Sequence, residues 1–476
     1  MAFWKKIHYK IISSRVHNLS RAPVFAIRRI RRAEKSAEKA TQEYWKKLGP
    51  GLTTGAADDD PSGIATYSQT GAKFGLHMSF MAIVTYPLMA VVQEMCARIG
   101  LVTNKGLAAN IRIHYPKWLL VSLTFLLFAA NTFNIGADLG AMAEATRLLF
   151  PNFPFIALVI FFTVFSLVLQ IFTSYKTYAG YLKWLALILF AYIITAFTIN
   201  LDWPEILKST FVPRFEFNRE SLLIIAAILG TTISPYLFFW QTSQEVEEKF
   251  LHNSVGESVG GGININSVGY RTVDSSDRDE INTVSKSEIK DMRLDVWTGM
   301  FISNLVMFFI IIVCSATLHA NGITDINTAA DAARALEPLA GRFAYLLFAV
   351  GIIGTGLLAV PILAGSTSYA IAESFHWVSG LHHKFREAYA FYGVIIVSMV
   401  VGLLLNFIGL DPIKALIYSA ILNCIVAPVV LVFIVLLSSK KEIMGNHASS
   451  TLQKTIGWFV VIVMSVVAIA TLLAIF

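Results

Sequence analysis

The residues that could do chemistry in this sequence lie in two short segments, each built around a proline. One reads Asp60-Pro61-Ser62-Gly63 and follows two further carboxylates, Asp58 and Asp59, whereas the other reads Thr231-Thr232-Ile233-Ser234-Pro235. Carboxylates, hydroxyls and free backbone carbonyls are the ligands that hard cations such as Mg²⁺, Mn²⁺ and Ca²⁺ prefer. The two segments therefore indicate an all-oxygen site for a divalent cation.

Both segments fall in the middle of long apolar stretches that are expected to cross a membrane. Proline removes a backbone donor and clashes with the preceding turn, and glycine permits unwound conformations, so each segment should interrupt a helix and free carbonyl oxygens near the bilayer midplane. An ionised Asp60 at that depth costs several kcal/mol unless a cation or a water-filled cavity compensates it. One such proline is commonly a packing kink, but two in corresponding helices indicate a binding site.

The composition predicts an all-α polytopic membrane protein. Of the 476 residues, 55% are hydrophobic and 14% charged, against about 25% charged in soluble domains. Stretches long enough to cross about 30 Å of hydrocarbon recur along the whole chain. We predict eleven transmembrane helices at 50–72, 77–98, 118–141, 155–174, 180–200, 220–246, 295–318, 342–374, 388–408, 413–437 and 456–476.

The two interrupted helices open two halves of five spans each. Five-span halves of opposite orientation, each beginning with a discontinuous helix, describe inverted-repeat transporters, whose sites lie between the breaks. We divide the chain into a basic N-terminal arm (1–47), a core of ten helices (48–437, with repeats at 48–200 and 220–437), and a linker with the eleventh helix (438–476). The segment 252–290 is rich in Gly, Ser and Asn and is predicted to be a flexible cytoplasmic loop.

The charges predict the orientation. Most of the 38 Lys and Arg residues fall on the side that holds the arm 1–47, so the positive-inside rule places the N-terminus in the cytoplasm and the C-terminus outside. The net charge of +7 then reflects topology rather than a nucleic-acid partner. The arm lacks the apolar core of a signal peptide and is expected either to lie on anionic lipid or to be solvated.

Other reactive residue types offer no competing site. Glu94 and Arg98, one helical turn apart, are interpreted as a structural ion pair, with closure of an inner gate as the alternative. Cysteines inside predicted spans are expected to behave as small hydrophobes, and clustered loop histidines without a carboxylate pattern as solvated residues. We therefore expect neither an enzyme nor a cofactor. The residues concerned are Cys96, Cys314, Cys424, His376, His382 and His383.

The first segment resembles a known family. Gly49-Pro50-Gly51, then eight residues, then Asp60-Pro61-Ser62-Gly63 is similar to the first helix of the Nramp metal transporters, whose motif reads Asp-Pro-Gly-Asn. The resemblance covers roughly 45–250 and 293–437, and it implies a LeuT-type fold. It continues through Gln93 to Gly100 with Gly106-Leu107, through Ala137-Asp138-Leu139, and through Gly230 to Pro235.

The resemblance also implies a set of metal ligands. They are the side chains of Asp60 and Ser234 and the carbonyls of Ala57 and Thr231, while Gly63 stands where the family has a ligating Asn and so widens the site. The family's glutamine in the tenth helix falls on Ala420, and Asn423 is a candidate substitute. Other candidates for the cavity or a gate are Asp58, Asp59, Tyr236, Asp138 and Asn423.

The departures from the family suggest a different substrate. Nramp proteins have Met-Pro-His where this chain has Ser234-Pro235-Tyr236, and methionine is a soft ligand that favours transition metals. The family's Asp-Leu-Ala-Glu becomes Asp138-Leu139-Gly140-Ala141, so the glutamate is lost. Tyrosine cannot relay protons near neutral pH as histidine can, although the retained Asp138 leaves coupling open. These changes resemble the Nramp-related magnesium transporters.

Three functions remain to be separated. The first is a secondary transporter that imports Mg²⁺ and Mn²⁺ by alternating access without obligatory proton coupling, as a monomer in the bacterial cytoplasmic membrane. The second is a proton-coupled Mn²⁺ or Fe²⁺ importer. The third is a Na⁺-coupled amino-acid transporter, which the negative charge of Asp60 opposes because helix N-termini at the breaks would serve a substrate carboxylate better without it.

Overall fold

Helices form the whole membrane-crossing region in the computed structural model, which describes residues 49–173, 187–213, 218–260 and 284–475. The predicted arm 1–47 and the middle of the predicted loop 252–290 lie outside the described residues. The edges of that loop are helical rather than irregular. One reason is a capping box, in which Ser285 Oγ accepts from Glu288 N over 3.1 Å and Glu288 Oε2 accepts from Ser285 N over 2.7 Å.

Each half of the chain supplies one broken helix and a series of continuous ones. The first half contains α3 (Pro50–Asp58), α4 (Pro61–Phe74), α5 (Phe80–Thr103), α6 (Leu107–His114), α7 (Lys117–Leu149), α8 (Phe155–Phe172), α10 (Phe190–Thr198) and α11 (Trp203–Phe211). The second half contains α12 (Arg219–Thr232), α13 (Pro235–Gly260), α14 (Lys286–Thr317), α15 (Ala329–Ala333), α16 (Glu337–Ala340), α17 (Ala344–Ser374), α18 (Tyr389–Leu405) and α19 (Pro412–Ser439). After them come α20 (Lys441–Met444) and α21 (Thr451–Ile475).

Short 3₁₀ turns join several of these helices. They are η1 (Gly75–Met78), η2 (Leu187–Leu189), η5 (His319–Asn321), η6 (Arg334–Leu336), η7 (Gly341–Phe343), η8 (Asn406–Ile408) and η9 (Gly445–His447).

Nine of the eleven predicted spans have a counterpart among the membrane-crossing helices of the described residues. Nine helical segments of the described residues are long and apolar enough to cross a membrane. The predicted span 50–72 is divided into two helices, α3 of 9 residues and α4 of 14 residues. Neither helix alone is long enough to be counted among the nine. The span predicted at 180–200 is described only from residue 187 onward.

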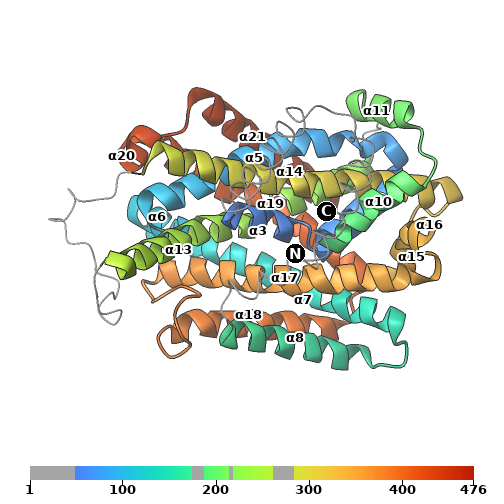
Figure 1. Cartoon of the computed structure of the whole chain (residues 1–476), viewed down its shortest axis with the longest axis horizontal. Coiled ribbons are helices and arrows are strands. Elements are labelled where there is room, and N and C mark those ends of the chain that lie inside the picture. Colours follow the sequence, from blue (N-terminus) through green and yellow to red (C-terminus); the bar gives the residue numbers. More distant parts are fainter. Residues whose placement is uncertain (1–48, 174–186, 214–217, 261–283, 476) are drawn as a thin grey trace, which may run out of the picture. The chain divides into compact units, whose positions relative to one another are not determined.

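The packing of the helices shows the inverted repeat. The second segment of the first broken helix, α4, packs on α14, and its counterpart α13 packs on α5. Likewise α7 packs on α8 as α17 packs on α18. Figure 1 shows α7 beside α17, and α8 beside α18. The predicted fold, an inverted repeat of five plus five helices with discontinuous first and sixth helices, is confirmed.

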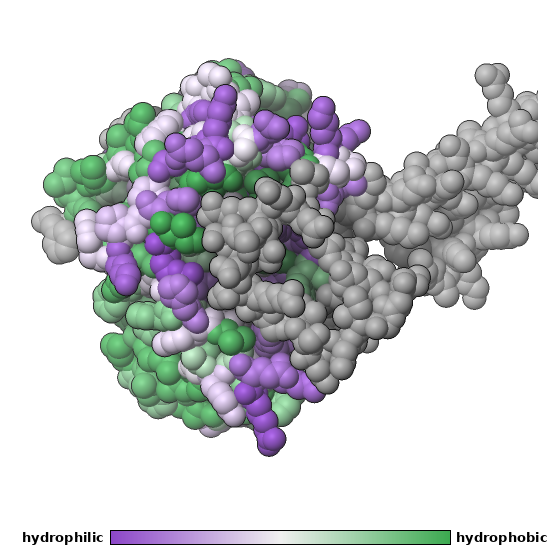
Figure 2. Space-filling model, turned by 90° about the vertical axis from the view of Figure 1, so that its left-hand side faces the viewer, coloured by the Kyte–Doolittle hydropathy of each residue, from purple (hydrophilic) through white to green (hydrophobic). Residues whose placement is uncertain are grey.

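The two ends of the helix bundle are named here by their short helices. The α6 end carries α6 and α20, and the α11 end carries α11, α15 and α16 (Figure 1). Figure 2 looks onto the α6 end, where hydrophilic residues gather while apolar residues cover the flanks. On the flanks, α8, α18 and α21 expose large apolar side chains such as Phe161, Leu404 and Ile462, as expected of surfaces in contact with lipid.

Near the α6 end, Glu94 joins three helices. It accepts a hydrogen bond from Arg98 within α5, from Arg293 (2.9 Å) and Trp297 (2.8 Å) on α14, and from Gln453 (2.9 Å) on α21. The carboxylate is almost wholly buried. The predicted pair of Glu94 and Arg98 is confirmed as part of this larger junction, which holds α21 against the core.

Two further expectations have clear outcomes. The three cysteines are buried and free, as predicted. The expectation that the histidines of the loop after α17 have no carboxylate partner was wrong, because the loop folds back against α13. His382 Nδ1 lies 3.4 Å from a carboxylate oxygen of Glu247, and His383 Nδ1 lies 3.5 Å from one of Glu387. Glu247 is distant in sequence, so spacing alone could not show this contact.

Candidate metal site

The first break leaves one carboxylate at the start of a helix. α3 ends at Asp58 and α4 begins at Pro61, a residue that suits the first helical position because its missing N–H would be unpaired there. Asp60 has an extended backbone and caps α4 through Oδ1, which accepts from Gly63 N (2.7 Å) and Ser62 Oγ (2.6 Å). The carboxylate is therefore fixed in orientation by its own helix, whose positive N-terminal end it faces.

The second break is bridged by a serine. α12 ends at Thr232 and α13 begins at Pro235. Ser234 Oγ lies 2.6 Å from the Gly230 carbonyl oxygen and 2.7 Å from that of Thr231, so it donates back to the end of α12. A hydroxyl that donates its proton keeps its oxygen lone pairs for a cation. Ser234 thus satisfies carbonyls that the proline leaves unpaired and still offers an oxygen.

The two breaks touch each other. Ser62 Oγ lies 3.4 Å from Thr231 Oγ1, and Tyr236 Oη donates to the carbonyl of Ala57 over 3.0 Å. A Cβ added to Gly63 would lie 3.2 Å from the Asp58 carbonyl oxygen and 3.3 Å from Thr231 Oγ1. The structure therefore brings the first helix and the sixth together at the residues that the sequence singled out.

α7 forms a third side of this region. Asn134 Nδ2 donates to Asp60 Oδ2 over 3.1 Å. Asp138, one turn further along α7, is fully buried, interacts electrostatically with Asp60 and makes no hydrogen bond with either oxygen. The sequence analysis missed Asn134. The available signal was an intramembrane polar residue four positions before Asp138, and therefore on the same helix face.

The other two carboxylates turn away from Asp60 towards α14. Ser303 Oγ lies 2.5 Å from Asp58 Oδ2 and 3.2 Å from Asp59 Oδ1. Over the described ranges, no three His, Cys, Asp or Glu side chains are grouped so as to hold a metal ion. The three aspartates accordingly point to two separate places, and Ser303 is a second residue that sequence reasoning did not find.

Asn423 lies apart from the hydrogen bonds of the breaks. It is fully buried on α19, and neither its oxygen nor its nitrogen has a hydrogen-bond partner. Next to Asn423, α19 packs directly on α12. The backbones approach so closely there that a Cβ on Gly230 of α12 would lie 2.7 Å from the backbone nitrogen of Cys424. The structure places Asn423 on a helix next to the second break but links it by no hydrogen bond to Thr231 or Ser234.

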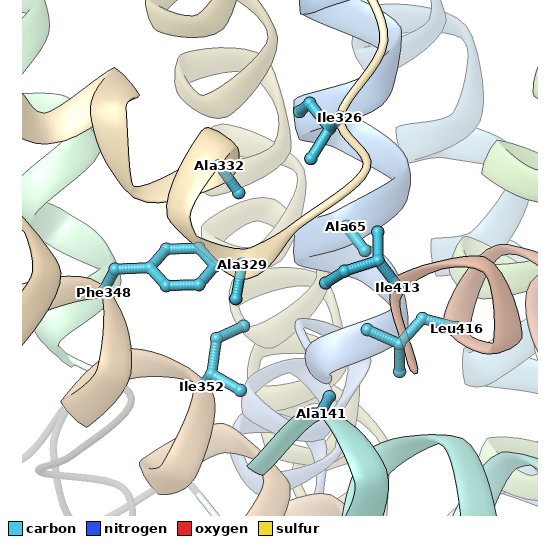
Figure 3. Close-up of a pocket in the computed structure, with 9 residues that line it drawn as sticks. All are labelled: Ala65, Ala141, Ile326, Ala329, Ala332, Phe348, Ile352, Ile413 and Leu416. Atoms are coloured by element: carbon cyan, nitrogen blue, oxygen red, sulfur yellow. The ribbon is translucent and has the colours of Figure 1, made fainter. Parts of the chain in front are cut away.

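The site is closed to solvent. Asp60, Ser62, Thr231 and Ser234 are each at most 1% exposed. On the α11 side of the break lies a small pocket (Figure 3). Its lining is entirely apolar: Ala65, Ala141, Ile326, Ala329, Ala332, Phe348, Ile352, Ile413 and Leu416. Ala141, at the position where the related motif has glutamate, faces this cavity.

Both ends of the first broken helix are tied to the second half of the chain. At the α6 end, Asp295 accepts from Gly51 N (2.6 Å) and Leu52 N (3.0 Å) and so caps α3. At the α11 end, Gln69 accepts from Ile326 N over 2.8 Å. The structure is therefore an arrangement in which the candidate site is occluded.

Comparison with known proteins agrees with this architecture. The family model described as natural resistance-associated macrophage protein-like (Nramp) matches residues 51–474. This chain belongs to the Nramp family.

Its relatives include the divalent metal cation transporter MntH of Caldanaerobacter subterraneus subsp. tengcongensis, 26% identical over 87% of this chain and 90% of the relative. MntH of Klebsiella pneumoniae is 24% identical over 90% and 94% of the two chains. These Nramp relatives are named as transporters and not as enzymes.

Solved structures show the same fold. A manganese transporter of Eremococcus coleocola superposes with a TM-score of 0.71 at 18% identity and covers 90% of this chain and 87% of that one. The structure of MhsT in complex with L-phenylalanine reaches a TM-score of 0.52 at 11% identity, with 90% of this chain and 98% of that one covered. The Nramp chain is thus a multi-pass membrane protein with the fold that these LeuT-type transporters share.

Proposed function

We propose that this Nramp-family protein imports Mg²⁺, and also Mn²⁺, by alternating access and without obligatory proton coupling. The names of its relatives, divalent metal cation transporter and manganese transporter, support the substrate class. By the distribution of Lys and Arg, the N-terminus and the α6 end face the cytoplasm and the C-terminus faces outside. The ion would be held by Asp60 and Ser234, by the carbonyls of Ala57 and Thr231, and by water beside Gly63.

The observation that carries the proposal is the oxygen chemistry of the two breaks. The groups that meet there are a carboxylate, hydroxyls and main-chain carbonyls, with Ser234 at the position where related transporters have methionine. Without a thioether, the site has no soft ligand to favour transition metals over Mg²⁺. Oxygen ligands alone suit Mg²⁺ and Mn²⁺ alike.

Gly63 favours a hydrated ion. Mg²⁺ gives up its waters reluctantly and usually keeps several in protein sites. Gly63 contributes no side-chain ligand, so we expect water to take that coordination position once the site opens; in the arrangement described here, the Asp58 carbonyl and the Thr231 hydroxyl lie 3.2 and 3.3 Å from where a Cβ would be. A few fixed oxygens with retained waters are therefore enough for binding.

The surroundings of the site also support transport without protons. The hydroxyl of Tyr236 is held on the Ala57 carbonyl, and tyrosine does not exchange its proton near neutral pH as histidine does. Ala141 lines an apolar cavity where the related motif would place a carboxylate. A proton path through these two positions is thus interrupted.

A second candidate, proton-coupled import of Mn²⁺, is favoured by one observation. Asp138 is a buried carboxylate close to Asp60, and neither of its oxygens is hydrogen-bonded. Excess Mg²⁺ distinguishes the two candidates, since it should compete with Mn²⁺ uptake under the first and leave it unchanged under the second.

Uptake into vesicles containing the purified protein tests the proposed function. We expect Mg²⁺ to enter, and Asp60→Asn to abolish uptake because it removes the negative ligand. Asp202→Asn is the matched control: Asp202 caps α11 through Glu205 N over 3.2 Å, and Asn caps helices equally well. If Asp60→Asn transports Mg²⁺ as the control does, Asp60 is not the anchor of the cation.

A further inference from the structure

The loop that joins α17 to α18, residues 375–388, presents aromatic side chains at the surface of the α6 end (Figure 1). Phe375 and Trp377 are 53% and 42% exposed, and their rings stack with centroids 5.2 Å apart. Phe385 is also exposed, and its ring packs edge-on against that of Tyr389, the exposed first residue of α18, with centroids 5.8 Å apart. Aromatic side chains gathered at the surface in this way indicate an interaction site.

The same loop carries two exposed basic side chains, Lys384 and Arg386, on either side of Phe385 in the sequence. None of the ion pairs formed among the described residues includes either of them. The one carboxylate of the loop belongs to Glu387, which accepts from the backbone nitrogen of Lys384 over 3.0 Å and lies 3.5 Å from His383 Nδ1. Lys384 and Arg386 are therefore available to bind an anion from outside the protein.

Hydrogen bonds to the helices around it fix the shape of the 375–388 loop. Glu247 on α13 accepts from the backbone nitrogen of Leu381 over 2.7 Å and from the hydroxyl of Tyr369 on α17. The hydroxyl of Tyr392 on α18 donates to the carbonyl of His383 over 2.8 Å. A surface whose shape is fixed beforehand loses less conformational entropy when it binds a partner, so the loop is preorganised for binding.

The position of the loop indicates a lipid as the partner. Tyr389, Val400 and Leu404 are all exposed on α18, and their spacing of 11 and 15 residues from Tyr389 places them on one face of the helix. The aromatic surface of the loop therefore continues into the apolar, lipid-facing flank of the protein. Aromatic side chains are enriched at the level of the headgroups, and lysine and arginine at that level attract anionic lipids.

We propose that the 375–388 loop binds an anionic phospholipid, whose headgroup phosphate is held by Lys384 and Arg386 while Phe375 and Trp377 lie at the boundary of the hydrocarbon. A phosphate offers the negative charge that the two basic side chains lack within the protein. In the orientation given above for the proposed function, this lipid belongs to the cytoplasmic leaflet. The proposal does not depend on which ion the protein transports, because the loop lies at the end of the bundle and not at the breaks.

Binding of fluorescently labelled phosphatidylglycerol to the purified full-length protein in neutral detergent tests the proposal, with labelled phosphatidylcholine as the zwitterionic comparison. We expect the native chain to prefer phosphatidylglycerol. The double variant Lys384→Gln with Arg386→Gln should bind it about 30-fold more weakly, since each basic residue near a membrane surface contributes roughly fivefold, and should bind phosphatidylcholine as before. Trp377→Ala should weaken the binding of both lipids, because the contact of the ring with lipid does not depend on headgroup charge.

A second double variant, Lys208→Gln with Arg219→Gln, is the matched control. It removes two exposed basic residues that belong to α11 and to the first turn of α12, and so leaves the 375–388 loop unchanged. We expect this control to bind phosphatidylglycerol as the native chain does.

The outcomes separate this proposal from the proposed function. Equal affinity of the native chain and the loop variant for phosphatidylglycerol, or an equal loss in the control, overturns the lipid surface and leaves Mg²⁺ uptake untouched. A loss confined to the loop variant supports the lipid surface, even if the native chain takes up no Mg²⁺. The loop variant should keep the native unfolding temperature in detergent without lipid, because both substituted side chains are exposed; a lowered temperature there would show that they stabilise the fold instead, and would overturn the proposal.

Discussion

The hydrogen bond from Tyr236 to the carbonyl of Ala57 allows a direct test of how the site is built. The bond is 3.0 Å long, and the same carbonyl is proposed to bind the cation. A carbonyl oxygen that already accepts a hydrogen bond has less electron density to offer a metal. We therefore expect Tyr236→Phe, which keeps the ring in its fully buried position, to make the oxygen of Ala57 a better ligand.

The magnitude follows from the cost of an unpaired acceptor. Leaving a buried carbonyl without its partner costs about 1–3 kcal/mol, so Tyr236→Phe should be less stable than the native chain by that amount when no cation is present. A bound cation pairs the oxygen again. If about 0.5–1.5 kcal/mol of the cost is recovered on binding, the Kd for Mg²⁺ falls roughly 2- to 10-fold.

The assay is thermal unfolding of the purified protein across a Mg²⁺ titration, repeated with Mn²⁺. Tyr392→Phe is the matched control, because its hydroxyl donates to the carbonyl of His383 over 2.8 Å at a place away from the breaks. The control should lose some stability and show an unchanged Kd. A tenfold weaker Kd in Tyr236→Phe refutes the reasoning, since the hydroxyl would then help to bind the ion.

Three further predictions concern the scaffold, and thermal unfolding measures each. Gly299→Ala should destabilise the protein by about 1–3 kcal/mol, because its Cβ would lie 2.7 Å from the carbonyl carbon of Gly51, whereas Gly393→Ala, with nothing within 4 Å, should not. Glu94→Gln should cost about 3–5 kcal/mol, since it leaves buried arginine charge unpaired; an unchanged midpoint contradicts the junction described above. Asp295→Ala removes the cap of α3 and should cost about 0.5–2 kcal/mol, and equal stability would show that the cap is not needed.

Much of the fold was predictable because membrane-spanning helices can be recognised in a sequence by their length and apolar composition. The breaks were equally accessible, since proline must interrupt the hydrogen bonding of a helix at a known residue. The structure confirms them between Asp58 and Pro61 and between Thr232 and Pro235. Helix ends were less predictable. Capping contacts such as that of Ser285 with Glu288 extend helices into segments whose composition suggests a loop.

The polar residues that surround the site could not be predicted from the sequence. Asn134 and Ser303 lie on α7 and α14, and only packing brings them to Asp60 and to Asp58. Three consecutive aspartates suggest one acidic cluster. In the structure they separate: Asp60 accepts a hydrogen bond from Asn134 on α7, whereas Asp58 and Asp59 both contact Ser303 on α14.

Simultaneous recording of Mg²⁺ and pH inside vesicles tests the central claim most directly. The vesicles contain the purified protein and receive external Mg²⁺ with and without an acidic outside. The hydrogen-bonded Tyr236 and the apolar setting of Ala141 predict Mg²⁺ uptake at the same rate in both conditions and no Mg²⁺-driven acidification of the interior. Proton uptake driven by Mn²⁺, with no Mg²⁺ flux in either condition, would contradict the account.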